Sequence, residues 1–285
     1  MLINEVNRYI CKEAIEHERT KPPRDGGIYW PSQASAVLAN GGVVGQCLRA
    51  SFYNIKRTPQ TNPPSIEALR KMAFGIKIEE FELQKAKASG VLIAPHITFE
   101  LLIGSIAIRG NIDGIGKKDD HLRGMEYKTG SGYYFTKEVW GTPWEPGSPR
   151  FSNLLQVMLY LEGFREHKEY AFDTCALIYI DRGTGATNEY TVRLDAGYPV
   201  IDEKPEYVVN IKSVYDRFKL LDRYITRNIL PPSDFRNTYS LEEVRQLYTQ
   251  KKISKKQFEG FIQMGSGCDA DCSWCNWYNQ CKRDS

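Results

Sequence analysis

Apolar residues recur along this chain with two different spacings. In some segments they return every three or four residues, the period of one helix face, which predicts helices over 2–19, 32–39, 45–53, 65–88, 150–164 and about 204–229. In others the apolar runs are short, rich in β-branched residues and separated by glycines, which predicts strands over 97–103, 105–109, 111–116, 122–128, 172–180 and 188–194. Together these elements predict an α/β fold with a mixed central sheet flanked by helices.

The helix predicted over 65–88 carries an acidic residue on its apolar stripe. The stripe consists of Leu69, Met72, Ile76 and Leu83. Glu79 follows Ile76 by three residues and falls on the same side. A carboxylate seldom lies on a buried face without a partner, so Glu79 is a candidate functional residue. The alternative is a carboxylate at the edge of the stripe that reaches solvent, and the neighbouring Glu80 leaves the register open.

Two further carboxylates lie in consecutive predicted strands. Glu126 and Lys128 are two residues apart, so the alternation of a strand points both side chains to one face, where Asp113 of the neighbouring strand can meet them. Two carboxylates bind a hard divalent cation, and the ammonium can orient or deprotonate an attacking water, which are the parts that phosphodiester cleavage needs. The alternatives are a turn-forming Asp-Gly pair and an exposed ion pair on a strand.

The overall composition changes this picture little. The 285 residues are 41% hydrophobic and 26% charged, which is ordinary for a soluble globular protein. The net charge of +3 permits a nucleic-acid partner without requiring one. Charges interrupt residues 1–20, and no apolar run approaches the roughly 18 residues of a spanning helix. We therefore expect no membrane association and a cytoplasmic location.

Four of the seven cysteines lie within fourteen residues of one another, at Cys268, Cys272, Cys275 and Cys281. Without secretory features, such a cluster indicates a metal or iron–sulfur site rather than a disulfide framework. We expect Cys11 and Cys175 to be small buried residues instead of ligands.

The order of these elements resembles RecB-like nucleases of the PD-(D/E)XK superfamily. The motifs that carry the resemblance are Gly75-Ile-Lys-Ile-Glu79, Gly110-Asn-Ile-Asp113, Glu126-Tyr-Lys128 and Gln156-Val-Met-Leu-Tyr160. The iron–sulfur branch of that family adds one cysteine upstream and three downstream, and Cys47 and Cys272-X2-Cys275-X5-Cys281 match them. Within this branch the chain is most similar to CRISPR-associated exonucleases and to AddB-type nuclease domains.

The resemblance implies a role for each matching residue. Asp113 and Glu126 would bind the catalytic Mg²⁺ or Mn²⁺, helped by the Tyr127 carbonyl, and Lys128 would serve the water nucleophile. Glu79 would be a further metal ligand, where many relatives carry histidine. Gln156 and Tyr160 lie one helical turn apart and would position the DNA or Lys128.

For the cysteines, two ligand sets compete. In the set that the resemblance implies, Cys47 joins Cys272, Cys275 and Cys281 on a [4Fe–4S] cluster. In a local set, Cys268 replaces Cys47 and the four-cysteine site could hold zinc. The first set is favoured because zinc ribbons usually use paired Cys-X2-Cys units, and this segment has one such unit.

The resemblance also implies a domain order and a function. We expect a restriction-endonuclease-like core over 65–232, preceded by a helical lobe over 1–64 that carries Cys47, and followed over 233–285 by a helical insertion (240–263) and the cysteine cluster. The expected activity is metal-dependent exonucleolytic hydrolysis of single-stranded DNA or duplex ends. Its setting would be CRISPR adaptation with an integrase, or recombination and repair, alone or with a helicase. The alternatives are a catalytically silent DNA-binding or assembly subunit and a zinc-binding interaction module.

Overall fold

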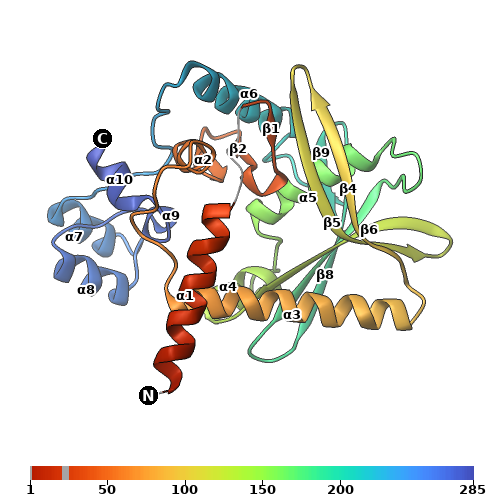
Figure 1. The fold of residues 1–285 in the computed structure, drawn as a ribbon, viewed down its shortest axis with the longest axis horizontal. Helices are drawn as coiled ribbons and strands as arrows, with labels where there is room; N and C mark the ends of the chain where they lie inside the picture. Colours follow the sequence, from red (N-terminus) through yellow and green to blue (C-terminus); the bar gives the residue numbers. More distant parts are fainter. Residues whose placement is uncertain (1, 21–25) are drawn as a thin grey trace.

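The computed structural model describes residues 2–20 and 26–285 and confirms the α/β architecture with a mixed central sheet (Figure 1). The strands of the central sheet are β1 (Ile28–Tyr29), β4 (Leu92–Ile103), β5 (Ile106–Lys118), β6 (His121–Gly130), β7 (Thr174–Asp181), β8 (Thr187–Asp195), β9 (Tyr198–Ile201) and β10 (Lys204–Pro205). They pair in the order β1-β5-β6-β7-β8-β9-β10, and β4 also pairs with β5. A separate two-stranded sheet contains β2 (Ser35–Val37) and β3 (Val43–Gly45).

Helices surround this sheet on several sides. They are α1 (Leu2–Thr20), the 3₁₀ helix η1 (Pro31–Gln33), α2 (Leu48–Ile55), α3 (Ile66–Ala88), α4 (Tyr133–Trp140), α5 (Phe151–Phe164), α6 (Ile211–Arg227), α7 (Leu241–Thr249), α8 (Lys255–Met264), α9 (Ala270–Ser273) and α10 (Tyr278–Arg283). In the described part of the chain, no helix is long and apolar enough to cross a membrane.

Strand β5 changes neighbours along its length. At Ala107 and Ile108 it runs parallel to β1, whereas from Gly114 to Lys118 it pairs antiparallel with β6. β6 then continues alongside β7 in parallel register as far as Gly130. β5 and β6 therefore separate just before Gly114, and this fork is where Asp113 lies.

Helix α5 forms the centre of the hydrophobic core. Its residues from Leu154 to Leu161 are buried, apart from the half-buried Gln156, so the helix has almost no solvent face. It packs against β4, β7 and β8 of the sheet and against β2, β3 and η1 on its other side. A helix buried on all sides has a fixed position, and α5 therefore holds Gln156 and Tyr160 rigidly relative to the strands.

Helix α3 confirms the predicted span, but its buried face differs from the predicted stripe. Met72 and Ile76 are exposed, whereas Leu83 packs in a small core with Leu92, Met125, Tyr127 and Ile180. Ile78 and Ala86 pack against the same core. The helix contacts β6, β4 and β5 through this side, which also presents Gly75 to Thr129.

Two other predicted helices differ from the structure. The segment 32–39 forms η1 and β2, because Asn40-Gly41-Gly42 makes a turn into β3, with Gly41 at φ +82°. The helix expected from about residue 204 begins only at Ile211, after the strands β9 and β10. Asn210 fixes that start, since its side-chain oxygen accepts a hydrogen bond from the Lys212 amide.

The segment after α6 folds back onto α2. The serines at 240 and 254 form the two capping boxes that start α7 and α8, as the sequence predicts. Beyond them, the Asn276 carbonyl accepts hydrogen bonds from the amides of Thr61 and Asn62, and the Trp277 indole donates to the Thr58 carbonyl. Residues far apart in sequence thus lie side by side, with α9 and α10 next to α2 (Figure 1).

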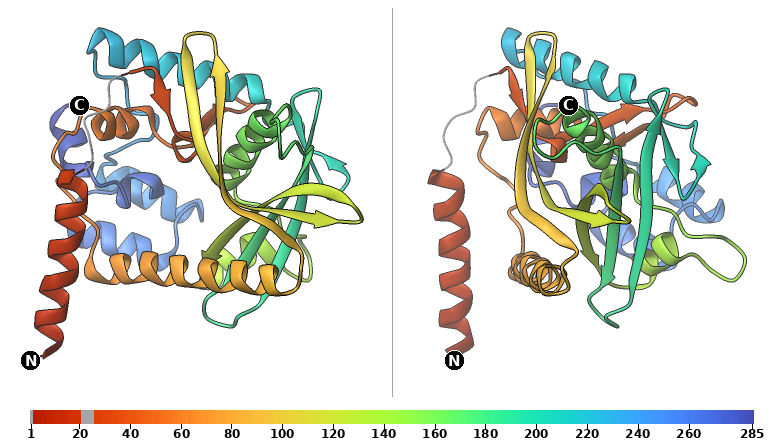
Figure 2. Two further views of the ribbon diagram at one scale, coloured as in Figure 1. Left: turned by 45° about the vertical axis from the view of Figure 1, so that its right-hand side comes forward. Right: turned by 90° about the vertical axis from the view of Figure 1, so that its right-hand side faces the viewer.

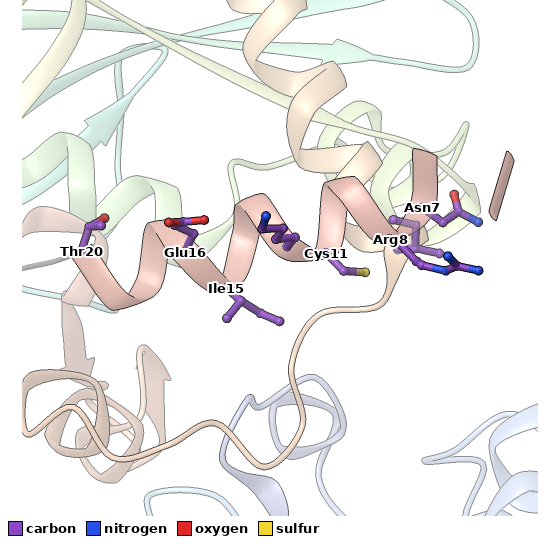
Figure 3. Close-up of a pocket in the computed structure, with 8 residues that line it drawn as sticks. Asn7, Arg8, Cys11, Ile15, Glu16 and Thr20 are labelled. Carbon is purple, nitrogen blue, oxygen red and sulfur yellow. The ribbon is translucent and has the colours of Figure 1, made fainter. Parts of the chain in front are cut away.

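Helix α1 projects from the body of the protein in both views of Figure 2. A shallow pocket runs along it (Figure 3), lined by Asn7, Arg8, Cys11, Lys12, Ile15, Glu16, Thr20 and Ile66. Its lining comes from α1 and the start of α3, away from the strands that carry the predicted carboxylates.

Candidate active site

Asp113 lies at the fork between β5 and β6, one residue beyond the last paired position, Gly114 with Met125, and Glu126 is the next residue of β6. Because the strands separate there, the amide of Tyr127 has no strand partner in β5 and instead donates to Asp113 Oδ2 at 2.7 Å. Burial raises the pKa of Asp113, although the Tyr127 amide and the Lys128 ammonium partly oppose this. The fork therefore creates a place where a carboxylate replaces a backbone acceptor.

Glu126 is the most deeply buried carboxylate of the site, with 2% of its side chain exposed. Its Oε1 accepts from Lys128 Nζ at 2.6 Å, while no described residue donates a hydrogen bond to Oε2. When it is protonated, Glu126 can itself donate to Asp113, an interaction that lowers the pKa of Asp113. Burial raises the pKa of Glu126 to about 8, against the opposing effect of the Lys128 charge. An unpaired buried carboxylate oxygen is costly, and a bound cation would satisfy it.

Lys128 lies on the same face of β6 as Glu126, as strand alternation predicts. Burial lowers its pKa, but the charges of Glu126 and Asp113 outweigh burial, so the net pKa of Lys128 is raised. In this arrangement its ammonium stays protonated and donates to Glu126.

Gln156 and Tyr160 face these strands from α5. Gln156 Nε2 donates to the Tyr160 hydroxyl at 2.6 Å. Burial, and after it the charge of Glu126, raises the pKa of Tyr160 well above its usual range, so the hydroxyl remains protonated beside the acidic group. The two side chains form a connected polar pair on an otherwise apolar helix.

Glu79 is half-buried on α3, on the side that faces the strands. Burial and then the negative charge of Asp113 raise its pKa, whereas Lys128 acts in the opposite direction. Glu80 is exposed and forms an ion pair with Lys77 at 2.7 Å. Of the two consecutive glutamates, Glu79 is therefore the one directed toward the other carboxylates.

The sequence analysis missed His96. The hairpin register pairs Pro95 with Gly114 and Ile97 with Ile112, which places His96 opposite Asp113. Its backbone is left-handed, with φ +51°, and its charge lowers the pKa of both Asp113 and Glu79. The tight connection between Ile103 and Ile106 could have revealed this position, since counting back from it pairs residue 96 with residue 113.

Within residues 2–20 and 26–285, no three His, Cys, Asp or Glu side chains converge closely enough to form a ready metal-binding group. Lys128 holds one oxygen of Glu126, and the Tyr127 amide holds one oxygen of Asp113. The chemistry of the donors nevertheless fits Mg²⁺ or Mn²⁺, because these hard cations prefer carboxylate and carbonyl oxygens. Because no described residue donates a hydrogen bond to Oε2 of Glu126, this oxygen is the one that a bound cation would satisfy.

The cysteines form a second group, next to α2. All seven cysteines of the described chain carry free thiols. Burial raises the pKa of Cys272, and the neighbouring sulfurs of Cys268, Cys47 and Cys281 raise it further. Burial also raises the pKa of Cys275, and the sulfurs of Cys47 and Cys281 raise it further. Cys175 is buried in β7, as expected, and Cys11 is half-buried on α1.

Polar contacts hold the cysteine group in place. Cys47 is the N-cap of α2, and Cys281 lies in α10. The buried Arg49 approaches the Cys281 sulfur at 3.6 Å and donates to the Pro231 carbonyl at 2.8 Å. Asn237 Nδ2 lies 3.4 Å from the same sulfur. Charged and amide donors around a sulfur are suited to a thiolate ligand.

Comparisons with known proteins agree with this geometry. A family model described as the PD-(D/E)XK nuclease superfamily matches residues 43–282. A search of curated proteins gives no match. A crystal structure of a protein designated SSO0001 shares the fold over the full length of both chains, with a TM-score of 0.52 and 12% sequence identity. From the extent of the family match, the chain belongs to the PD-(D/E)XK nuclease superfamily, whose members typically use Mg²⁺ or Mn²⁺.

Proposed function

We propose that this protein is a Mg²⁺- or Mn²⁺-dependent deoxyribonuclease that removes nucleotides from single strands or duplex ends. The observation that carries this proposal is the buried carboxyl group of Glu126, with one oxygen on Lys128, the other without a donor, and the Asp113 carboxyl beside it. A buried set of ionisable groups is expensive to maintain, and a silent assembly subunit has no chemical need for it.

The roles in this mechanism follow from position. Asp113, Glu126 and the Tyr127 carbonyl would hold the cation, with Glu79 closing the site from α3. When bound, the cation would neutralise charge that develops on the phosphate and lower the pKa of a water, so that hydroxide is available as the nucleophile. Lys128 would orient that water, since its ammonium lies beside Glu126 on the same strand face. Gln156 and the protonated Tyr160 can donate to a phosphate oxygen from the opposite side.

We also propose that Cys47, Cys272, Cys275 and Cys281 hold a [4Fe–4S] cluster. The surroundings of Cys272 and Cys275 support this set, because the sulfurs of Cys47 and Cys281 act on the pKa of both thiols. Cys268 also raises the pKa of Cys272, but the thiol of Cys268 is itself hydrogen-bonded to Tyr278. The role proposed for the cluster is structural, joining α2 to the C-terminal segment. The helical pair α7–α8 is the segment we propose for contact with a partner, such as an integrase or a helicase.

Linear and circular DNA distinguish the proposed exonuclease from other nucleases. With Mg²⁺ or Mn²⁺, the purified protein should release nucleotides from end-labelled linear single strands and spare circular single strands of the same sequence. Time-resolved product lengths on denaturing gels provide the measurement. Equal cleavage of circles and linear strands would show an endonuclease, and intact DNA of both forms would refute the nuclease proposal.

Glu79 should strengthen cation binding. Adding Mn²⁺ at about one hundred times its dissociation constant should raise the melting temperature of the wild-type protein by roughly 5 °C. In Glu79→Gln this gain should shrink by about half, because one carboxylate near Asp113 is lost. Glu80→Gln is the matched control and should keep the full gain, since Glu80 pairs with Lys77 at the surface.

The rise in melting temperature on adding Mn²⁺ should also depend on pH, and it should be larger at higher pH. Burial raises the pKa of Glu79, Asp113 and Glu126, the last from 4.5 to about 8. The folded metal-free protein therefore retains protons that the unfolded chain has lost, and its stability falls as pH rises from about 4.5 to about 8. Mn²⁺ should accordingly stabilise more at pH 8 than at pH 6, and a gain unchanged by pH would contradict this site.

A further inference from the structure

We propose that Tyr133 and Tyr134, at the start of α4, form a stacking platform for the bases of a single DNA strand at the entrance to the candidate active site. This inference deepens the proposed function and rests on it. It names unstacked bases, in addition to phosphates, as the part of the substrate that the protein recognises.

The platform is placed by the strand that carries the catalytic residues. Alternation along β6 puts Glu126, Lys128 and Gly130 on one face. A Cβ atom at Gly130 would lie 2.3 Å from the ring of Phe135, so that ring occupies the next position on the face after Lys128. Tyr133 and Tyr134 immediately precede Phe135, so α4 begins beside the end of the face that carries Glu126 and Lys128.

The two tyrosines are exposed although their helix has a well-packed apolar side. Phe135 and Val139 of α4 are buried, whereas Tyr133 and Tyr134 are each 71% exposed. Their rings lie 5.5 Å apart at an angle of 73°. Large exposed aromatic rings beside a functional site favour binding, and flat rings stack on bases of any sequence.

The framework beneath the tyrosines is rigid. Phe135 packs against Tyr179 of β7 and Trp140 of α4, with ring centroids 6.0 and 5.6 Å away. At the far end of α4, the Val139 carbonyl accepts hydrogen bonds from Asn188 and Tyr190. The helix is therefore fixed to the sheet at both ends, so the rings are held ready at little further cost in entropy.

Positive groups lie at the same end of β6. The amide of Arg182 donates to the Gly130 carbonyl at 2.8 Å, and its guanidinium donates to the Lys71 carbonyl at 2.6 Å. These two cationic residues can meet the phosphates of a strand whose bases lie on the tyrosines. Since the net charge is only +3, base stacking should contribute a large part of the affinity. Duplex bases are already stacked on each other, so the platform favours single strands or frayed ends.

The test measures how much affinity for a single strand comes from contacts with its bases. In EDTA, where no cleavage occurs, fluorescence anisotropy gives the dissociation constants of a labelled oligothymidylate and of an equally long oligonucleotide of abasic sites. Wild type should bind the thymidylate about tenfold more tightly than the abasic strand, equivalent to ~1.4 kcal/mol. The double variant Tyr133→Ala/Tyr134→Ala should reduce this ratio to near one.

Two controls separate stacking from other effects. Tyr133→Phe/Tyr134→Phe retains both rings and should keep the tenfold ratio. Trp144→Ala removes a ring that is 91% exposed beyond the other end of α4 and should also keep it. The proposal fails if wild type shows no preference for bases, if the alanine pair keeps the preference, or if either control loses it.

Failure of the platform and failure of the proposed function give different results. Hydrolysis of DNA without a preference for bases would refute the platform and leave the nuclease. Preference for bases that depends on Tyr133 and Tyr134, in a protein that hydrolyses no DNA with Mg²⁺ or Mn²⁺, would establish the platform and refute the nuclease.

Discussion

Replacing Asp113 or Glu126 by alanine is expected to abolish metal-dependent DNA degradation, with a loss of at least about 100-fold in rate. Both residues supply oxygen atoms to the proposed cation, and their side chains interact just beyond the point where β5 and β6 separate. Each variant should retain the far-ultraviolet circular dichroism of the wild type. The rate of nucleotide release from a linear single strand is the measurement.

Asp113 also offers a sharper variant. In Asp113→Asn a carbonyl oxygen remains for the Tyr127 amide, so the local backbone keeps its hydrogen bond while the charge is lost. This variant should be as inactive as alanine but more stable. Asp120→Asn is the matched control, because Asp120 is exposed in the turn of the same hairpin and pairs with Lys117. Full activity in Asp113→Asn or in Glu126→Ala would rule out the proposed roles.

Cys47→Ser is expected to lose iron and to unfold at a temperature about 10 °C lower. Cys47 and its proposed partners are more than two hundred residues apart, so a shared cluster closes a very long loop, worth ~5 kcal/mol if it acts like a covalent cross-link. Iron analysis and the absorption band near about 400 nm of anaerobically purified protein measure the cluster.

Cys268→Ser is the matched comparison, since Cys268 is the one cysteine that distinguishes the two ligand sets. It should keep its iron, its absorption band and its stability. Loss of iron in Cys268→Ser with unchanged iron in Cys47→Ser would instead establish a local site. If the wild type contains stoichiometric zinc and no iron, the cysteines form a zinc site and the iron–sulfur proposal is wrong.

The relations that the sequence predicted correctly are those between residues close to one another along the chain. Glu126 and Lys128 share a face because strand alternation is local, and Asp113 meets them through one short hairpin. Such relations can be counted along the chain. His96 belongs to the same hairpin system, but its left-handed backbone breaks the alternation on which a count of faces relies. Counting back along β4 and β5 from their tight connection finds it, whereas the alternation of faces does not.

Longer-range relations were predicted less well. Apolar spacing gave the extent of α3 but the wrong buried side, since Met72 and Ile76 face solvent and Leu83 faces the small core. Which stripe a helix buries depends on the surface it meets, and periodicity does not contain that surface. The approach of the C-terminal segment to Cys47 likewise depends on docking across the whole chain, so only the family resemblance indicated it.

The docking of the C-terminal segment on α2 has a consequence during synthesis. Arg49 of α2 is synthesised long before Cys281 and Ser285, which contact it in the folded protein. At ~5–20 residues per second, the ribosome needs more than ten seconds to deliver them. Until then Cys47 lacks its neighbouring cysteines and Tyr53 lacks the Trp277 ring that packs against it, so both side chains stay open to contact with other molecules. This region of the fold is therefore completed late, after nearly the whole chain has been synthesised.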